Sequence, residues 1–338
     1  MTPERIAVRL TNWVGDCVMN TPFLGRLRAI YPKARIGVWG RKSVTGILQN
    51  HPHVDEIHVL DDKSRGGFLA AARELRAWRA DLGFLLPNSL QTAALFAFAG
   101  VKRRVGYDRD GRRLLLTDPV ALRPEDLAVH EVRYYLRLLH RFDPAPPASP
   151  PPLLLAVTDA ERAEMEMWLE TRGVAPGEMV LGVNPAAFFG TAKRWPAERY
   201  AEAARVLADR LDCRVVVTGL PQERDVAQAV CDAGGARFHN GAGEMSLRQL
   251  MAFLARCGLY LTNDSGAMHI AAALGTPLVA VFGSTDWVTT APLSPKARIV
   301  RVETPCAPCL LRHCPIDHRC MTGVTPGMVV EAAEGLLG

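Results

Sequence analysis

The sequence lacks several features that would assign a protein to a common functional class. It has no apolar run that approaches the ~20 residues of a membrane-spanning helix, and no signal peptide precedes the strand predicted from residue 5. No Gly-x-x-x-x-Gly-Lys-Ser/Thr loop is present, and Gly241-Ala-Gly243 is followed by Ser246 where a dinucleotide fingerprint needs a third glycine. There is also no Gly-x-Ser-x-Gly elbow. We therefore expect a cytoplasmic protein that uses neither P-loop, nicotinamide nor α/β-hydrolase chemistry.

Length and composition are those of a globular protein with two domains. The chain has 338 residues, of which 49% are hydrophobic and 22% are charged. Charge is unevenly distributed. Residues 1–150 hold 23 Lys and Arg against 15 Asp and Glu, a net charge of +8, whereas the whole chain has a net charge of +5. The basic runs Lys102-Arg-Arg104 and Arg112-Arg113 favour an acidic partner, although solvated surfaces carry such runs about as often.

Apolar strand patterns alternate with helical patterns along two stretches of the chain. The first stretch has predicted strands at residues 6–10, 36–39, 57–60 and 82–86, and the second at 180–183, 214–217, 259–262 and 278–282. Between them, residues 144–152 contain six prolines in nine positions, which excludes a helix or a central strand. The sequence therefore predicts two Rossmann-like α/β domains, residues 1–145 and 153–324, which a linker at 146–152 joins across a cleft.

The stretch from Leu259 to Gly283 is predicted to be a strand, a polar loop, a helix and a second strand. Asp264 or Ser265 is the expected N-cap of a helix from Gly266 to Leu274. The polar tip would then lie at the carboxyl end of a strand, where the helix N-terminus favours an anion such as phosphate. His269 would lie within about one turn of the helix start and could reach the same anion. Ordinary capping residues are the alternative interpretation.

Three other predicted strand ends carry charged side chains. Asp16 follows the first strand, either as a functional carboxylate or as an acid that complements a helix dipole. Lys193 and Arg194 precede a helix predicted from Pro196, and cations at that end oppose the dipole unless an anion lies between. Glu223 could bind ribose hydroxyls or be a first-turn acid.

Two patterns suggest metal sites only weakly. Asp108-Arg-Asp110 has the spacing that some sugar transferases use for a divalent metal, but the following Gly111 favours a turn. Cys306, Cys309, Cys314 and Cys320 lie within 15 residues, in a spacing that matches neither paired zinc-binding cysteines nor a ferredoxin run. Free thiols or local disulfides are favoured over a metal there. The other cysteines, Cys17, Cys213, Cys231 and Cys257, are expected in the core.

Taken in order, the motifs resemble those of glycosyltransferase family 9, the heptosyltransferases. The resemblance covers nearly the whole chain and is carried by Trp13-Val-Gly-Asp16, Val105-Gly-Tyr107, Ala192-Lys-Arg-Trp-Pro196 and Asn263-Asp-Ser-Gly-Ala-Met-His269 with the Ala-Ala-Ala-Leu-Gly-Thr-Pro277 that follows. It implies a GT-B fold, with the acceptor on the first domain and the nucleotide sugar on the second. By analogy with GT-B enzymes, the last helix, about 325–338, is expected to return to the first domain. The Cys-rich segment is a departure, since some members lack it.

The resemblance also implies a reaction. Heptose would pass from ADP-heptose, without a metal or other cofactor, to the first heptose of the lipopolysaccharide inner core, as in heptosyl-Kdo2-lipid A. The protein would contact the inner membrane peripherally from its cytoplasmic face and would bind no nucleic acid.

Site residues follow from the same resemblance. The family's catalytic aspartate matches Asp16, its phosphate-binding lysine matches Lys193, and its ribose-binding glutamate matches Glu223. The pyrophosphate loop matches Asp264, Ser265, Gly266 and His269. Thr191 and Arg194, on either side of Lys193, are further candidates for substrate binding.

Two other functions remain open from the sequence. One is transfer by the same kind of enzyme with a different sugar or acceptor, because specificity loops are not legible in one sequence. The other is a non-catalytic module that binds a nucleotide sugar, or one stabilised by zinc, in which Asp16 would merely cap a helix.

Overall fold

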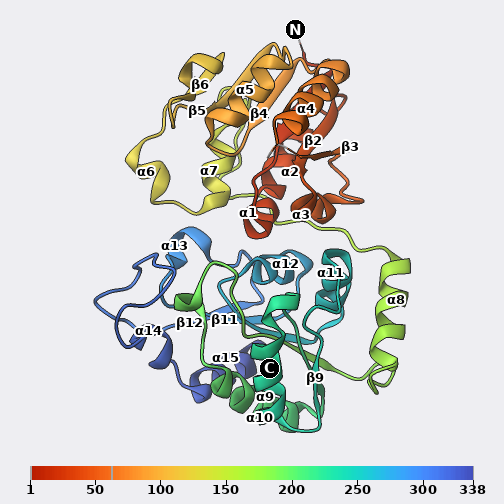
Figure 1. Cartoon of the computed structure of the whole chain (residues 1–338), viewed down its shortest axis with the longest axis vertical. Coiled ribbons are helices and arrows are strands. Elements are labelled where there is room, and N and C mark those ends of the chain that lie inside the picture. Colours follow the sequence, from red (N-terminus) through yellow and green to blue (C-terminus); the bar gives the residue numbers. More distant parts are fainter. Residues whose placement is uncertain (1, 62–63, 338) are drawn as a thin grey trace. The chain divides into compact units, whose positions relative to one another are not determined.

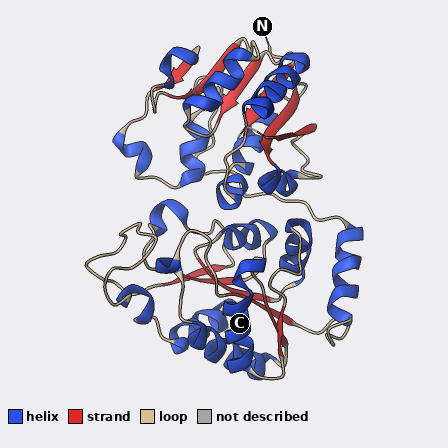
Figure 2. Cartoon of the chain, viewed as in Figure 1, coloured by secondary structure: helices blue, strands red, loops and turns tan. Residues whose placement is uncertain are grey.

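A computed structural model describes residues 2–61 and 64–337 of the chain. The chain divides into two compact units, Met1–Ala156 and Val157–Gly338, each an α/β unit built on a parallel sheet (Figures 1 and 2). The division falls just after the Pro-rich stretch. Among the described residues no helix has the length and apolar character to cross a bilayer.

The first unit contains a parallel sheet that has six strands in the described residues, in the order β3-β2-β1-β4-β5-β6. These strands are β1 (Arg5–Arg9), β2 (Arg35–Arg41), β3 (Glu56–Leu60), β4 (Leu82–Leu85), β5 (Arg103–Tyr107) and β6 (Asp118–Val120). The four strands expected from apolar runs are confirmed. β5 begins with two arginines and β6 has three residues, so neither gives an apolar run that would predict it.

Helices cover both faces of this sheet. They are α1 (Val14–Met19), α2 (Thr21–Ile30), α3 (Lys42–Thr45), η1 (Gly46–Leu48), α4 (Arg65–Trp78), α5 (Leu90–Phe98), η2 (Arg112–Leu115), α6 (Pro124–Leu127) and α7 (Glu131–Arg137). α4, α5 and η2 pack side by side on one face, whereas α2 and α7 pack together on the other. α1 lies between β1 and α2, so Asp16 is in the first turn of a helix.

The second unit repeats this architecture. Its described residues form six parallel strands in the order β12-β11-β10-β7-β8-β9. These strands are β7 (Val180–Asn184), β8 (Arg214–Val217), β9 (Phe238–Asn240), β10 (Leu259–Asn263), β11 (Leu278–Val281) and β12 (Ala297–Val300). Four of them confirm the strands predicted from sequence, and β9 and β12 are short edge strands that the prediction did not include.

The helices of the second unit form a layer on each side of its sheet (Figure 2). They are α8 (Asp159–Glu170), η3 (Thr191–Lys193), α9 (Ala197–Leu211), η4 (Pro221–Glu223), α10 (Arg224–Gly234), α11 (Leu247–Arg256), α12 (Gly266–Leu274), α13 (Trp287–Thr290), α14 (Arg319–Thr322) and α15 (Pro326–Leu337). α9 contacts α10 and α15, and α11 contacts α8 and α12.

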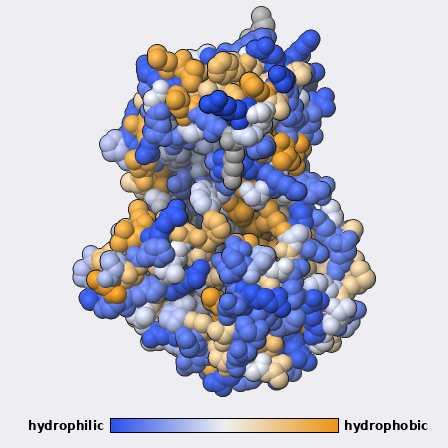
Figure 3. Space-filling view, in the orientation of Figure 1, coloured by the Kyte–Doolittle hydropathy of each residue, from blue (hydrophilic) through white to orange (hydrophobic). Residues whose placement is uncertain are grey.

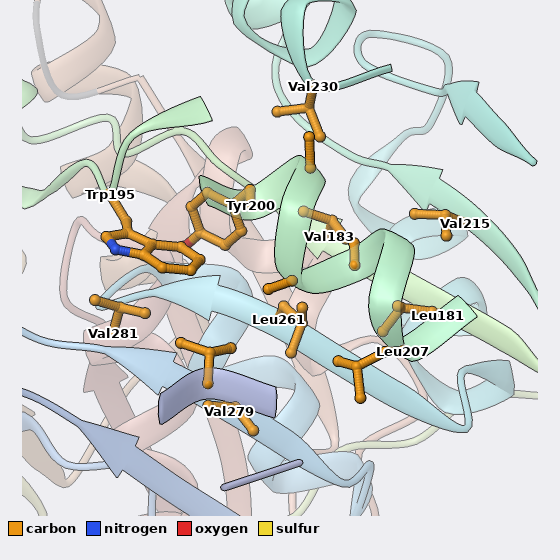
Figure 4. Close-up of a cluster of buried hydrophobic side chains, with 14 of the residues drawn as sticks. Leu181, Val183, Trp195, Tyr200, Leu207, Val215, Val230, Leu261, Val279 and Val281 are labelled. Atoms are coloured by element: carbon orange, nitrogen blue, oxygen red, sulfur yellow. The ribbon is translucent and has the colours of Figure 1, made fainter. Parts of the chain in front are cut away.

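Aliphatic strand residues and two aromatic rings form the core between the sheet and α9 (Figure 4). Trp195 and Tyr200 meet edge to face with their ring centroids 4.8 Å apart. The Trp195 indole N–H donates to the Val324 carbonyl at 3.0 Å, so the one polar atom of this buried side chain is satisfied. The loop that carries Lys193 is thus anchored in the core two residues further on.

The position of the last helix, α15, differs from the expectation that it returns to the first domain. α15 packs on α9, β11 and β12, and Val329, Val330 and Ala333 are buried in the core cluster of the second unit. Its apolar residues pack against the sheet at β11 and β12, and their burial decides its position. α15 therefore belongs to the second unit.

Candidate functional site

Strand order places two of the predicted polar tips side by side in the second unit. β7 and β10 are neighbours, and from them the chain proceeds in opposite directions across the sheet, through β8 and β9 or through β11 and β12. Open parallel sheets bind ligands at the carboxyl ends of strands at such a reversal. The loop of residues 185–196 follows β7, and the Asp264–Ser265 tip follows β10. The reversal thus brings the two tips together.

An ion pair joins these two tips. Lys193 Nζ, at the end of η3, lies 2.7 Å from Asp264 Oδ2, and the two side chains are only 16% and 6% exposed. Lys193 Nζ also lies 5.2 Å from the centre of the Phe189 ring. The poorly hydrated Lys193 ammonium stays charged because the Asp264 carboxylate is close. Each of the two side chains also restricts the rotamers of the other. The ammonium group is therefore held in a defined position at the strand ends.

α12 adds a second source of positive potential at the same place. Ser265 is its N-cap, and the Ser265 hydroxyl accepts a hydrogen bond from the Met268 N–H at 3.3 Å and contacts the Thr262 hydroxyl at 3.1 Å. The helix starts at Gly266, directly after Asp264, and His269 is buried within its first turns. The positive end of the helix dipole and the Lys193 ammonium thus favour an anion here.

The remaining predicted residues of this unit lie nearby or make local bonds. Arg194 approaches the Ala187 carbonyl at 3.5 Å, while its buried Nε has no hydrogen-bond partner among the described residues. Glu223 is buried, and one carboxylate oxygen accepts the Leu220 N–H at 2.8 Å as the cap of η4. This bond fits the first-turn role weighed from sequence. The ribose role of Glu223 stays a prediction.

The Cys-rich segment supports the lysine loop from outside. The Ala192 N–H donates to the Arg312 carbonyl at 3.0 Å, His318 Nε2 lies 2.8 Å from the Ala192 carbonyl, and Thr191 Oγ1 lies 3.0 Å from His313 Nδ1. A side chain at Gly190 would meet the Arg312 carbonyl at 2.2 Å, so only glycine fits. Residues 312–318 therefore fix η3. The spacing of its cysteines gives no sign of this supporting role.

The four cysteines of this segment are free thiols in the structure. Cys306 and Cys309 are exposed, Cys314 is half-buried and Cys320 is buried. Within the described residues, no group of three or more Cys, His, Asp or Glu side chains is arranged to hold a metal ion. The interpretation of this segment as free thiols or local disulfides stays a prediction.

A pocket of about 260 Å³ lies at the corresponding point of the first unit. Here the strand order reverses between β1 and β4, and the segments that follow these strands supply much of the wall. Asp16 lines this pocket from α1, together with Asn12 and Trp13. Arg9, completely buried at the end of β1, donates to Asn12 Oδ1 at 3.0 Å and so holds that part of the wall.

Other residues of the lining are not among the site residues predicted from sequence. They are Asn88, Arg109, Glu131, Tyr134 and Tyr135. The buried Arg112 holds Asn88 Oδ1 at 2.9 Å and also donates to the Pro87 carbonyl. The only signal in the sequence is a cluster of polar and aromatic residues, Glu131 to Tyr135, on a short helix far from the first strand. Local patterns do not relate that helix to Asp16.

Two of these side chains share their surroundings with Asp16. Burial raises the pKa of the Glu131 carboxyl, and a hydrogen bond with Tyr135 opposes that shift. The pKa of Tyr135 is raised well above its ordinary value, first by burial and then by the negative charges of Asp16 and Glu131. Tyr135 is therefore a neutral hydroxyl next to two carboxyl groups. A pocket with this lining can hold a polyhydroxylated ligand and accept a proton from it.

The chain is similar to proteins of known family. The family model of glycosyltransferase family 9 (heptosyltransferase) matches residues 68–319. The chain is 32% identical to lipopolysaccharide heptosyltransferase 2 of Escherichia coli, over 98% of each chain.

Solved structures show the same arrangement of elements. The structure of E. coli ADP-heptose lipopolysaccharide heptosyltransferase II matches with a TM-score of 0.84 at 32% identity, over 98% of each chain. A family 9 glycosyltransferase from Veillonella parvula matches with a TM-score of 0.87 at 25% identity, over 99% of this chain and 97% of the other.

The thiols should divide into a reactive and an unreactive class in the native protein. Cys306, Cys309 and Cys314 are accessible, and we expect these three to react within minutes with a disulfide reagent near pH 8. Burial raises the pKa of Cys17 to about 12 and that of Cys213 and Cys231 to about 11, and it also raises the pKa of Cys257 and Cys320. These five thiols therefore stay protonated and protected until the chain unfolds.

Thiol counts before and after addition of denaturant, with metal analysis of the same sample, test this division. A tightly bound metal ion that protects the three accessible cysteines would contradict it.

Proposed function

Because the chain belongs to glycosyltransferase family 9, the heptosyltransferases, and is a glycosyltransferase with two Rossmann-like units of GT-B type, we propose that it is a heptosyltransferase II. In this proposal it transfers L-glycero-D-manno-heptose from ADP-heptose to the first heptose of the lipopolysaccharide inner core, with inversion at the anomeric carbon. The names of its full-length relatives support the choice of donor and acceptor. The Lys193–Asp264 pair at the N-terminus of α12 is the observation that carries the proposed chemistry.

The second unit is proposed to bind the donor. Lys193, the N-terminal end of α12 from Ser265 and Gly266, and His269 would face the pyrophosphate, with Thr191 and Arg194 beside it. Glu223 would contact the ribose. As the bond between the anomeric carbon and the phosphate oxygen breaks, negative charge grows on the departing ADP, and the ammonium and helix dipole stabilise it. Cationic groups of the protein thus supply the stabilisation that other transferases obtain from a metal, and no cofactor is required.

The first unit is proposed to bind the acceptor, with Asp16 as general base. The acceptor hydroxyl attacks the anomeric carbon and its proton passes to the Asp16 carboxylate. The pocket's size and polar lining support this assignment, because Asn12, Asn88 and Arg109 can hydrogen-bond a sugar or its phosphate. The two units must then act on one bond. An acceptor attached to a lipid also requires peripheral contact with the inner membrane from the cytoplasmic side.

Product analysis tests the function as a whole. We expect the purified protein to release ADP and to add one heptose to a deacylated heptosyl-Kdo2 acceptor when ADP-heptose is the donor, as measured by mass spectrometry. Transfer to a Kdo2 acceptor without heptose would indicate heptosyltransferase I instead. Transfer from another nucleotide sugar would identify a different member of the family, and binding without any transfer would support the non-catalytic alternative.

Asp16→Asn should separate chemistry from donor binding. The amide has nearly the shape of the carboxylate but does not accept a proton, so turnover should fall by about 10² or more. ADP affinity, measured by titration calorimetry, should stay unchanged, because Asp16 belongs to the acceptor side. Glu4→Gln, at an exposed position before β1 of the same unit, is the matched control and should retain activity. Normal turnover of Asp16→Asn would remove this residue from catalysis.

Lys193→Ala should reduce both donor binding and turnover. Loss of a charge-assisted contact to phosphate is worth about 1.5–3 kcal/mol, so ADP affinity should decrease by ~10- to 100-fold. Lys296→Ala, which removes an exposed lysine from the same unit, should change neither quantity. Calorimetry with ADP provides the measurement, and full ADP affinity after the loss of Lys193 would exclude its phosphate role.

A further inference from the structure

α5 is unusual for a helix on the surface of a unit. Residues 82–101, which include it, contain no Asp, Glu, Lys, Arg or His. The polar residues of α5 are Gln91 and Thr92, and Thr92 is buried. A helix that is apolar on all sides is normally buried. Leu90 and Phe98 are nevertheless 52% and 66% exposed, and Ala94 and Ala97 lie between them at helical spacing.

The exposed side of α5 continues onto its two neighbours. The Phe68 and Phe98 rings meet edge to face with centroids 6.2 Å apart, which joins α5 to α4, where Leu69 is 52% exposed. On the other side α5 packs against η2, where Leu114 is 94% exposed. The inner sides of these helices already pack on the core cluster of the unit. Leu69, Leu90, Phe98 and Leu114 therefore form a second, solvent-facing apolar surface, which we name the α4–α5 face.

Figure 3 shows exposed hydrophobic residues over the part of the first unit where Figure 1 draws α5, β5 and β6. Hydrophobic residues gather there and hydrophilic residues flank them. Large exposed apolar surfaces with a polar rim mark sites of protein or membrane interaction.

The rim of the α4–α5 face is basic. Residues 64–118 hold ten Lys and Arg against five Asp and Glu, a net charge of +5, which equals that of the whole chain. α4 contributes the exposed residues Arg65, Arg73 and Arg76, and η2 contributes Arg113. The one acid of α4, Glu74, is bonded to His58 Nδ1 at 2.6 Å, on the side toward β3. Apolar side chains surrounded by arginines are complementary to a surface of anionic phospholipids.

The α4–α5 face also adjoins the pocket that contains Asp16. Pro87 and Asn88 line the pocket, and Leu90 begins the face two residues later. Arg112 of η2 holds Asn88, while Leu114 of the same short helix is almost fully exposed. Residues 87–90 therefore contribute both to the pocket lining and to the α4–α5 face. A lipid-linked acceptor could place its sugars in the pocket while its acyl chains remain in a bilayer against the face.

We infer that the α4–α5 face docks the protein on an anionic phospholipid bilayer. This inference rests on the proposed function in one respect, since a lipid-linked acceptor gives the docking its purpose. Leucine and phenylalanine side chains enter the boundary between headgroups and acyl chains, and the arginines contact the phosphates. A second copy of the chain is a poorer occupant, because two basic rims would repel one another.

Vesicle binding of the full-length protein tests the inference without donor or acceptor present. Wild type should float with vesicles of phosphatidylethanolamine and phosphatidylglycerol and bind phosphatidylcholine vesicles much less. Phe98→Ser with Leu114→Ser should reduce the partition coefficient by about 10-fold or more, because two large apolar groups no longer enter the bilayer. Arg65→Gln with Arg73→Gln should reduce it by about 5-fold per arginine, on anionic vesicles only and less at high salt.

Val59→Ser with Met167→Ser is the matched control, since these residues are 55% and 58% exposed outside the α4–α5 face and should leave binding unchanged. Thermal unfolding and transfer to a deacylated, water-soluble acceptor establish that each variant is folded. Failure of the proposed function would appear as absence of that transfer, independently of vesicle binding.

Three outcomes would overturn the inference: absence of binding by wild type, equal binding by the Phe98 and Leu114 variant, or self-association of wild type that this variant abolishes in place of vesicle binding.

Discussion

The pairing of Lys193 with Asp264 is the constraint on which the second unit's site depends. An ammonium group that is 16% exposed beside a carboxylate that is 6% exposed has to be matched, because removal of one partner of a buried pair typically costs about 3–5 kcal/mol. The pair needs β7 and β10 as neighbours, α12 capped by Ser265, and η3 held by the 312–318 segment. Strand order, helix capping and loop support therefore all serve the position of one cation at a helix N-terminus.

The two units share one architecture but present different side chains at its strand ends. In each, the order of parallel strands reverses beside the first strand, and the segments that diverge there carry the polar groups. The second unit presents a cation and a helix dipole, which suit a pyrophosphate. The first unit presents Asp16, Glu131 and a neutral Tyr135, which suit hydroxyl groups and proton transfer. This division of charge corresponds to the division between a leaving group and an attacking nucleophile in glycosyl transfer.

Much of the fold could be predicted from the sequence. Elements set by interactions between neighbouring residues were predicted, and those set by interactions between distant residues were not. The apolar runs of β1 and β10 and the helix-start signal at Ser265 are local, so they predicted these elements correctly. The edge strands β6 and β9 have three residues each, too few for a periodic signal. Analogy with GT-B enzymes predicts α15 on the first domain. Its apolar side shows only that it must be buried, and its contacts with α9, β11 and β12 place it in the second unit.

The sequence by itself determined the alternation of strands and helices, the polar strand ends and the family, because periodicity, capping and ordered motifs depend on neighbouring residues. Only the tertiary structure decided that Lys193 contacts Asp264, that α7 brings Glu131 and Tyr135 to the pocket of Asp16, and that α5 leaves an apolar side open. Each of these depends on which strands become neighbours and which surfaces remain uncovered. The pairing of strands and the surfaces left uncovered are decided by burial across the whole chain, so no short stretch of sequence indicates them.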